Sequence, residues 1–460
     1  MRTLSFLTVL LLLCCMYASA QYDTRIKHIP KHKPADSAEY DDGEEEMDDD
    51  MDMSDQPKKM KSMPSALSLY LPMNRNGSGT SWLPDAAPMY GYMMHHKEWM
   101  FMSHGDIYIR YNKQDITNAG SRGGDKIDAP DMLMGMAQRK IGTKGLLHFN
   151  VMLSTDAIIA GGSGYPLLFQ TGESWKNQPL VDRQHPHDLF SELSASYSYA
   201  LSDKSDAFIY IGYPGEPALG PVTFMHRTSG MFGPDAPIGH HWQDATHITF
   251  GVATLGIRYG RFRLEGSSFT GREPDEDRYA FDKPRFNSFS SRLSYNPSAN
   301  WAIQVSSGFI KSPEALAPGE DIVRTTASAT YVHPMGKNKF VSATAVLGQN
   351  LIDGQDASNS ALLEATLKLK KLALYTRYEF VQKTGEELNL PGIIYRLDKQ
   401  YPVHALTLGG SYDVYSFKGV TMAAGAQLAA YKGDKALNSL YGEMPISGEV
   451  FLHFYPRLMN

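Results

Sequence analysis

Two stretches of the chain are rich in histidine, and each lies just before a segment that alternates like a strand. The first is VDRQHPHDLF, and the second is FMHRTSGMFGPDAPIGHHWQDATHITF. Their candidate metal ligands are His185, His187, His240, His241 and His247. Imidazole nitrogens bind first-row transition metals, and alternate residues of an extended segment project to the same face. The pattern therefore indicates a metal or ligand site where the two loops converge.

The same histidines have a second interpretation, in which they hydrogen-bond within the loops while Pro186 and Pro237 fix turns. Histidine pairs without cysteine are a loose metal signal. The second stretch also contains Met225, His226, Met231 and Asp244. Metal binding would require neutral imidazoles, so occupancy should fall as the pH drops through the ordinary histidine pKa of about 6.5.

A third group of candidate ligands lies upstream, in the segment YMMHHKEWMFMSHG. Thioether sulfur is a soft ligand that suits Cu(I), and imidazole or carboxylate can hold Cu(II) at the same place. These residues predict a copper site, and copper is the one cofactor that the sequence suggests. The alternative is that the methionines are flexible apolar filler in a plug or a membrane-proximal segment. The candidates are Met93, Met94, His95, His96, Met100, Met102 and His104.

Enzyme templates are weak, and we expect no catalytic activity. The chain has no G-x-S-x-G, H-E-x-x-H or phosphate-binding glycine loop in the right context. A barrel enzyme that acts on envelope lipid remains an alternative, and it would need a serine and histidine pair on the lipid-facing rim.

The elements that must position these ligands are short alternating segments. In DLFSELSASYSYALS, Leu193, Tyr197 and Leu201 fall on one face, and Glu192 and Ser196 on the other. From Gly105 onward we expect sixteen such strands. They cover about 105–112, 132–140, 145–154, 188–201, 206–214, 247–259, 261–270, 287–296, 301–311, 323–333, 339–349, 360–370, 372–382, 404–417, 419–431 and 446–456.

Strands of this kind cross a membrane only as a closed barrel, because every backbone polar group must be paired within the protein. The connections alternate between short turns and long polar loops, which places the turns in the periplasm and the loops outside. The sequence thus predicts an all-β protein, a closed antiparallel transmembrane β-barrel of about 16 strands, with 14 to 18 as its range. Such a lumen admits water and small solutes unless loops or a plug fold into it.

The composition fits a barrel in a bacterial outer membrane. A mean hydropathy of −0.34 resembles that of a soluble protein, but barrels place apolar residues only at alternate positions. The expected partners are outer-membrane lipid, lipopolysaccharide, the barrel-assembly machinery and a metal ion, and no nucleic acid. Charges of both signs predict cross-strand ion pairs in the lumen. The inward-facing charged residues are Glu192, Arg258, Arg263, Glu265, Arg292, Glu364, Lys368, Arg377 and Glu379.

The N-terminal hundred residues divide into three segments. Residues 1–20 resemble a secretory signal peptide, although Cys14 or Cys15 leaves a lipoprotein alternative, and both cysteines of the chain lie there. Residues 21–64 form an acidic, Met-rich tail that should be disordered in the periplasm, because its charge run cannot bury enough apolar area. Residues 65–104 form a Met/His-rich lead-in or plug, and 105–460 form the barrel, so the first hundred residues should lie outside the wall.

Six segments together carry a resemblance. They are SGYPLLFQTGES, VDRQHPHDLF, GYPGEPALGPVTFMHR, GHHWQDATHITFGVATLG, FTGREPDEDR and NWAIQVSSGFIKSPE. They resemble a family of poorly characterised outer-membrane β-barrel proteins of Gram-negative bacteria that are often found beside copper and heavy-metal resistance systems. The resemblance is close over residues 100–350, and the C-terminal strands match by pattern. It implies metal handling and supplies no ligand residues.

Three functions remain open after the sequence has been read. The first is passage or surface capture of small solutes, with copper or another soft metal as the candidate. The second is a general porin whose histidine-rich loops are only structural. The third is the lipid-directed barrel enzyme.

Overall fold

The computed structural model describes residues 63–459. The predicted signal peptide and nearly all of the acidic tail at 21–64 lie outside these residues. Within the described part of the chain, no helix is both long enough and apolar enough to cross a membrane.

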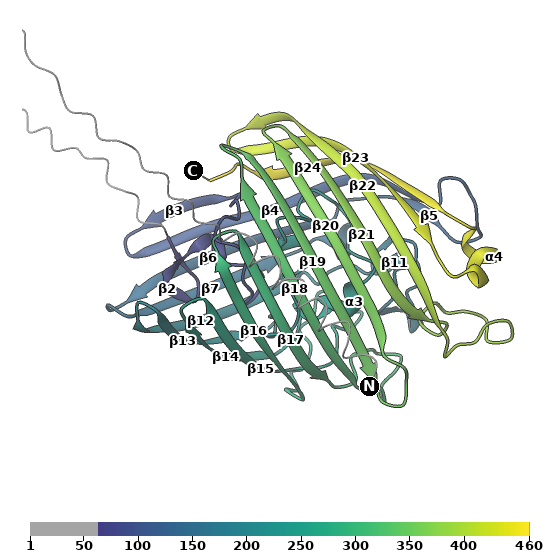
Figure 1. The fold of residues 1–460 in the computed structure, drawn as a ribbon, viewed down its shortest axis with the longest axis horizontal. Helices are drawn as coiled ribbons and strands as arrows, with labels where there is room; N and C mark the ends of the chain where they lie inside the picture. Colours follow the sequence, from purple (N-terminus) through teal and green to yellow (C-terminus); the bar gives the residue numbers. More distant parts are fainter. Residues whose placement is uncertain (1–62, 460) are drawn as a thin grey trace, which may run out of the picture. The chain divides into compact units, whose positions relative to one another are not determined.

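Sixteen antiparallel strands form a closed barrel, as the alternating pattern predicted (Figure 1). Each strand pairs with its neighbour in the chain, and the last strand pairs with the first to close the wall. The wall strands are β4 (Trp99–Gln114), β6 (Asp131–Ile141), β7 (Gly145–Leu153), β12 (Phe190–Ser202), β13 (Ser205–Gly212), β14 (Val252–Tyr259), β15 (Phe262–Phe269), β16 (Ser288–Ser298), β17 (Trp301–Ile310), β18 (Ile322–Pro334), β19 (Lys339–Ile352), β20 (Ser358–Leu369), β21 (Leu372–Thr384), β22 (Gln400–Phe417), β23 (Val420–Lys432) and β24 (Ile446–Pro456).

The seam of the barrel differs from the prediction. The wall begins at Trp99 rather than at Gly105, and β3 (Tyr92–His96) pairs with the first residues of β4. The strand β24 pairs with β4 only from Ile107 onward, so β3 covers an edge that would otherwise be open. A second short strand, β5 (Gly124–Asp128), continues the other edge of β4. Of the N-terminal hundred residues, the structure describes 63–100, and within these the segment 63–91 is not part of the wall.

The outer surface of the wall is apolar and its inner surface is polar. In β12, Leu193, Tyr197 and Leu201 are exposed, whereas Ser194 and Ser196 are buried. The same alternation runs around the barrel, and the nine charged residues predicted to face the lumen are all buried. A closed sheet with exposed leucine and phenylalanine at alternate positions is suited to lipid. We conclude that the barrel spans a membrane.

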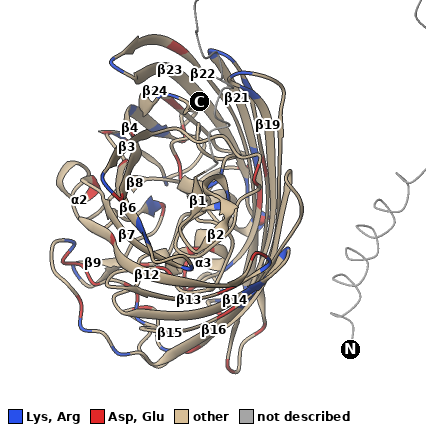
Figure 2. Cartoon of the chain, turned by 90° about the vertical axis from the view of Figure 1, so that its left-hand side faces the viewer, with Lys and Arg blue, Asp and Glu red and all other residues tan. Residues whose placement is uncertain are grey.

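Short connections lie at one end of the barrel and long loops at the other. Two long loops, 154–189 and 213–251, contain short elements that lie within the ring of strands, as does the segment 63–91. Figure 2 shows β1, β2, β8 and α3 there. The short elements outside the wall in the described chain, including those not within the ring, are β1 (Pro64–Ser65), β2 (Ser68–Pro72), η1 (Met73–Arg75), α2 (Asp156–Ile159), β8 (Tyr165–Pro166), β9 (Ser174–Trp175), β10 (Gln178–Pro179), β11 (Arg183–Gln184), η2 (Phe224–His226), α3 (His240–Gln243), η3 (Ala245–His247), η4 (Lys435–Leu437) and α4 (Asn438–Tyr441).

Residues 63–91 fill the end of the lumen that carries the short turns. The Ser68 hydroxyl donates to Asp206 at 2.7 Å, and Tyr90 donates to Asn338 at 3.0 Å. Arg292 on β16 donates to the Thr80 hydroxyl at 2.8 Å. These partners lie on three different wall strands or turns, so the segment is fixed across the lumen.

The loop 213–251 fills the lumen from the opposite end. Arg227 is fully buried and donates to Glu364 on β20 at 2.8 Å. Arg110 on β4 forms an ion pair with Asp235 at 2.5 Å, and Asn350 on β19 donates to the His241 carbonyl at 3.0 Å. The long loops are therefore bonded to the wall on several sides, and they occupy the space that an open channel would need.

Candidate functional site

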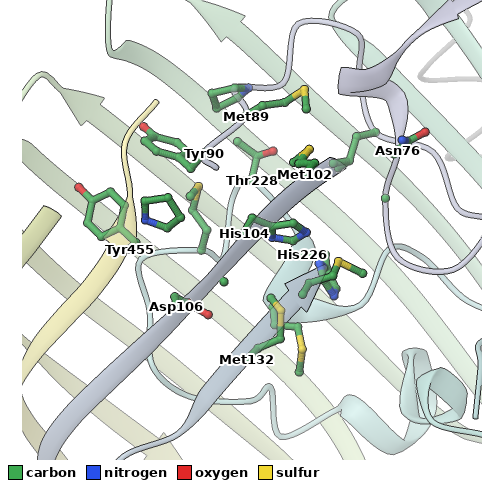
Figure 3. A pocket seen from close by; sticks show the side chains of 18 of the residues that line it. Asn76, Met89, Tyr90, Met102, His104, Asp106, Met132, His226, Thr228 and Tyr455 are labelled. Carbon is green, nitrogen blue, oxygen red and sulfur yellow. The ribbon is translucent and has the colours of Figure 1, made fainter. Parts of the chain in front are cut away.

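A methionine-lined cavity lies in the lumen between the segment 63–91 and the loop 213–251 (Figure 3). Its volume is about 130 Å³. Two facing imidazoles, those of His104 and His226, share its wall, with their ring centroids 6.0 Å apart. Asp106 and His453 also line it. The methionines around it are Met73, Met89, Met102, Met132, Met134, Met136, Met225 and Met231.

The alternation of two neighbouring strands brings these side chains together. On β4, Met102 and His104 face inward because they are two residues apart. On β6, Met132 and Met134 face inward for the same reason, and Met134 lies directly opposite His104 in the strand register. Such cross-strand neighbours have their Cβ atoms about 5 Å apart. The short helix η2 then supplies His226 from the lumen side.

The side chains of the predicted ligand segment Met93–His104 point to two opposite faces of the sheet. Met100, Met102 and His104 point inward, and the half-buried Met93 packs against the cluster of Met73, Met100 and Met102. Met94 is 61% exposed, and His95 and His96 are exposed as well. Consecutive residues of a strand point to opposite faces, so these twelve residues cannot wrap one ion together. The inward-facing residues of this segment lie beside methionines from other elements instead.

Burial keeps His226 neutral. It lowers the pKa of this imidazole to about 3, and the nearby His104 and His187 act in the same direction. Its neutral ring therefore has a lone pair on one nitrogen at neutral pH.

We expect the His226 imidazole to remain neutral between pH 7 and pH 4.5 in the folded protein. The measurement is the ¹⁵N signal of labelled histidine in detergent micelles, assigned by comparison with a His226→Gln variant. Urea-unfolded protein is the reference, because its histidines should titrate near 6.5. A His226 titration above pH 5 in the folded protein would contradict the burial argument.

The five predicted loop histidines lie together on the long-loop side of this cavity. Their ring centroids are 5.1 Å apart for His240 and His247, 5.3 Å for His240 and His241, 5.5 Å for His187 and His247, and 5.7 Å for His185 and His241. Gly172 allows this packing, because a Cβ atom there would overlap the His241 ring. We call these five residues the histidine cluster.

Most of the imidazoles in the cluster are oriented through Nδ1. His187 donates to Asp156 at 2.7 Å, and His240 donates to the Asp244 carboxylate at 2.6 Å. His247 donates to the Asp244 carbonyl at 3.0 Å. In the neutral ring these bonds place the proton on Nδ1 and leave the lone pair on Nε2. Within residues 63–459, the Nε2 atoms of four cluster members are buried and have no hydrogen-bond partner, namely those of His185, His187, His241 and His247.

The pKa values of histidines in the cluster differ from the ordinary value of about 6.5 that was expected from the sequence. Burial lowers the pKa of both His185 and His247 well below the usual 6.5. For His187 burial acts in the same direction, but the hydrogen bond to Asp156 and the charges of Asp156, Asp188 and Glu173 together outweigh it, and the pKa is raised. A uniform loss of binding near pH 6.5 is therefore no longer expected. His185 and His247 stay neutral at lower pH.

The side chains of the cluster do not form a ready chelate. Among residues 63–459, no three histidine, aspartate or glutamate side chains are arranged to hold one metal ion. Each imidazole offers a single nitrogen instead. A role for these histidines as metal ligands stays a prediction.

A second cavity, of about 560 Å³, lies among the long loops beside the cluster. Glu173 and Glu273 line it, and they also contact His185 at 3.2 Å and His241 at 3.4 Å. Its remaining charged residues are Asp275, Glu276, Asp277, Asp282, Arg272, Lys283 and Arg285. Carboxylates outnumber basic groups here, which favours cations over anions near the cluster.

Models of known protein families give no match to the chain, and neither do curated protein sequences. Several solved structures resemble it. The anion-selective porin from Comamonas acidovorans is 12% identical, with a TM-score of 0.48 over 78% of this chain and 99% of the porin. Salmonella typhi OmpF, solved with daunomycin, is 10% identical, with a TM-score of 0.48 over 79% and 100%. OmpT of Vibrio cholerae is 8% identical, with a TM-score of 0.44 over 79% and 100%. These similarities are too low for any property of those proteins to be transferred to this chain.

Sequence reasoning missed the methionines that β6 contributes to the cavity. Met132, Met134 and Met136 are spaced two apart in DMLMGMAQ, and this period would have placed them on the inward face of one strand. The loop residues Met225 and His226 were noted by their type, but their direction into the cavity could not be predicted, because a loop has no period from which a direction can be read.

Proposed function

We propose that this barrel lies in the outer membrane and serves the capture or controlled passage of a small solute, and that the solute is a copper ion or another soft transition metal ion. The apolar exterior of the wall supports a membrane location. The segment 63–91 and loops that are hydrogen-bonded to the wall fill the lumen, and this filling favours a controlled path over a wide aqueous pore.

One observation carries the metal part of the proposal. Four buried Nε2 atoms of the histidine cluster have no hydrogen-bond partner in the described chain, and the cluster lies between an acid-lined cavity and the methionine cavity. An ion could thus move from carboxylates to neutral imidazoles and then to thioethers. Contacts with one nitrogen at a time suit passage, since an ion must bind well enough to enter and weakly enough to leave.

A general porin is the competing function. The bonds from His187 to Asp156 and from His240 to Asp244 would stabilise the loops without any ligand. In that case the loop histidines are structural, and solutes would pass whenever the loops move.

Flux into proteoliposomes separates the two functions. We expect Cu(II) or Cu(I) to reach an entrapped chelating dye, while sugars enter slowly because the lumen is filled. Replacing His185 and His187 together by Gln should lower the rate of metal entry about tenfold, since two of the free imidazole nitrogens are lost. His333→Gln, at an exposed position, is the matched control. Fast sugar entry, with metal entry unchanged in a folded double variant, would instead identify a general porin.

A further inference from the structure

The methionine cavity differs from the histidine cluster in its chemistry. Its donors are thioethers and the imidazoles of His104, His226 and His453, and one carboxylate, Asp106, lies on the same wall, 3.4 Å from His453. Hard cations such as Mg²⁺ and Ca²⁺ prefer oxygen ligands, whereas thioether sulfur selects soft ions. A single negative charge at the edge of a buried site is matched to a monovalent cation, because a buried charge needs a counter-charge.

The geometry points to a site for a soft monovalent ion, Cu(I) or its redox-inert analogue Ag(I), held by His104, His226, Met134 and Met225. Met134 lies opposite His104 in the register of β4 and β6, and Met225 is the chain neighbour of His226. The four donors therefore come in two pairs, one from the wall and one from the loop 213–251. Binding adds no redox step, because the ion enters and leaves as the monovalent form.

The cavity has the room and the isolation that such a site requires. Its volume of about 130 Å³ is several times the roughly 10–15 Å³ that one water molecule needs on the same measure, so an ion fits beside its ligands. The segment 63–91 covers the cavity on one side through Met73 and Met89, and the loop 213–251 covers it on the other. Metal bound there would bridge the wall and the loop. The cavity would be one binding site on the proposed path, and in that respect its assignment rests on the proposed function.

An alternative account is that these methionines are only apolar filler. A Met→Leu change distinguishes the two, because leucine keeps the apolar volume and removes the sulfur. Met134→Leu combined with Met225→Leu is the test variant. Met152→Leu is the matched control, since Met152 is a buried, inward-facing methionine on the adjacent strand β7 but does not line the cavity.

The experiment is an anaerobic Cu(I) titration of the full chain against a chromophoric competitor, repeated with Ag(I). Cys14 and Cys15 are replaced by Ser in every sample, so that thiolates do not mask thioethers. The methionines of the N-terminal tail are common to all variants and cancel in the comparison. We expect the double variant to lose one bound ion, or to bind it at least about tenfold more weakly. X-ray absorption should show fewer sulfur neighbours around copper, and Met152→Leu should resemble the parent.

Unchanged affinity and stoichiometry in the double variant, with its heat-modifiable electrophoretic mobility intact, would overturn the site. Flux into proteoliposomes keeps this result separate from the proposed function. Weaker binding together with slower metal entry supports both. Weaker binding with unchanged metal entry leaves the site in place and removes passage through it.

Discussion

Replacing Arg227 by Met is expected to destabilise the folded barrel by about 3–5 kcal/mol and to free the loop 213–251. The Arg227 guanidinium is fully buried and bonds to two carboxylates, Glu364 at 2.8 Å and Asp244 at 2.9 Å. It also donates to the Val222 carbonyl at 3.2 Å. Without the arginine, one wall carboxylate and one loop carboxylate would remain buried with less compensation, and this cost dominates the effect.

Arg377 lessens the loss without removing it. Its guanidinium lies 3.2 Å from Glu364, so this carboxylate keeps one partner. Among side-chain partners in the described chain, Asp244 keeps only the hydrogen bond from His240. The loop side of the ion-pair network is therefore affected more than the wall side, and we expect the loop to leave the lumen before the barrel unfolds.

The measurements are the temperature of the heat-induced mobility shift and the noise of single-channel recordings. The variant should lose its folded mobility at a lower temperature and show more frequent current fluctuations. Arg396→Met is the control, because Arg396 and Asp398 form an exposed pair on a long loop, and such pairs contribute little. A variant whose mobility-shift temperature and current fluctuations match those of the parent would show that Arg227 does not fix the loop in the lumen.

The wall could be predicted from sequence because a strand that faces lipid on one side and the lumen on the other repeats every two residues. In β12, Leu193 and Tyr197 show this period clearly, and the register then follows from short turns such as that at Asp203 and Lys204. The pattern is local, so it needs no knowledge of distant contacts. The same rule explains why the charged residues predicted for the lumen are all buried.

The seam and the lumen contents could not be predicted in this way. Residues Tyr92–His96 join the wall because β24 stops pairing at Ile107, which is a property of the closed barrel rather than of the segment itself. The loop histidines could be selected by type, since imidazole is a common metal ligand. The partners that orient them, Asp156 and Asp244, depend on how the loops fold inside the barrel. The pKa values of the imidazoles likewise follow from burial, which the sequence does not show.

The largest change in conductance is expected when both obstructions of the lumen are removed together. The segment 63–91 closes the short-turn end, and the loop 213–251 closes the other. They lie one after the other along the path, so an ion must pass both, and the tighter obstruction limits the current. Deleting residues 63–90 alone should therefore raise single-channel conductance only modestly.

The barrel should survive this deletion, because the charges that it uncovers remain paired within the wall. Arg292 and Arg263 both contact Glu265, at 3.1 Å and 3.2 Å. Arg258 likewise keeps its ion pair with Asp206 after Ser68 is lost. The deletion ends before β3, because removing Tyr92–His96 would open the seam beside β4.

Combining the deletion of 63–90 with Arg227→Met should raise conductance far more than the two separate changes predict, toward that of an open sixteen-stranded barrel, whose lumen is wide enough for an aqueous channel. The reason is the serial arrangement, since each single change leaves the other obstruction in place. Single-channel recordings of the parent, both single variants and the combined variant, all checked for heat-modifiable mobility, measure the effect. If the deletion alone already gives the open conductance, the long loops do not obstruct the lumen, and the segment 63–91 is the only barrier in the described chain.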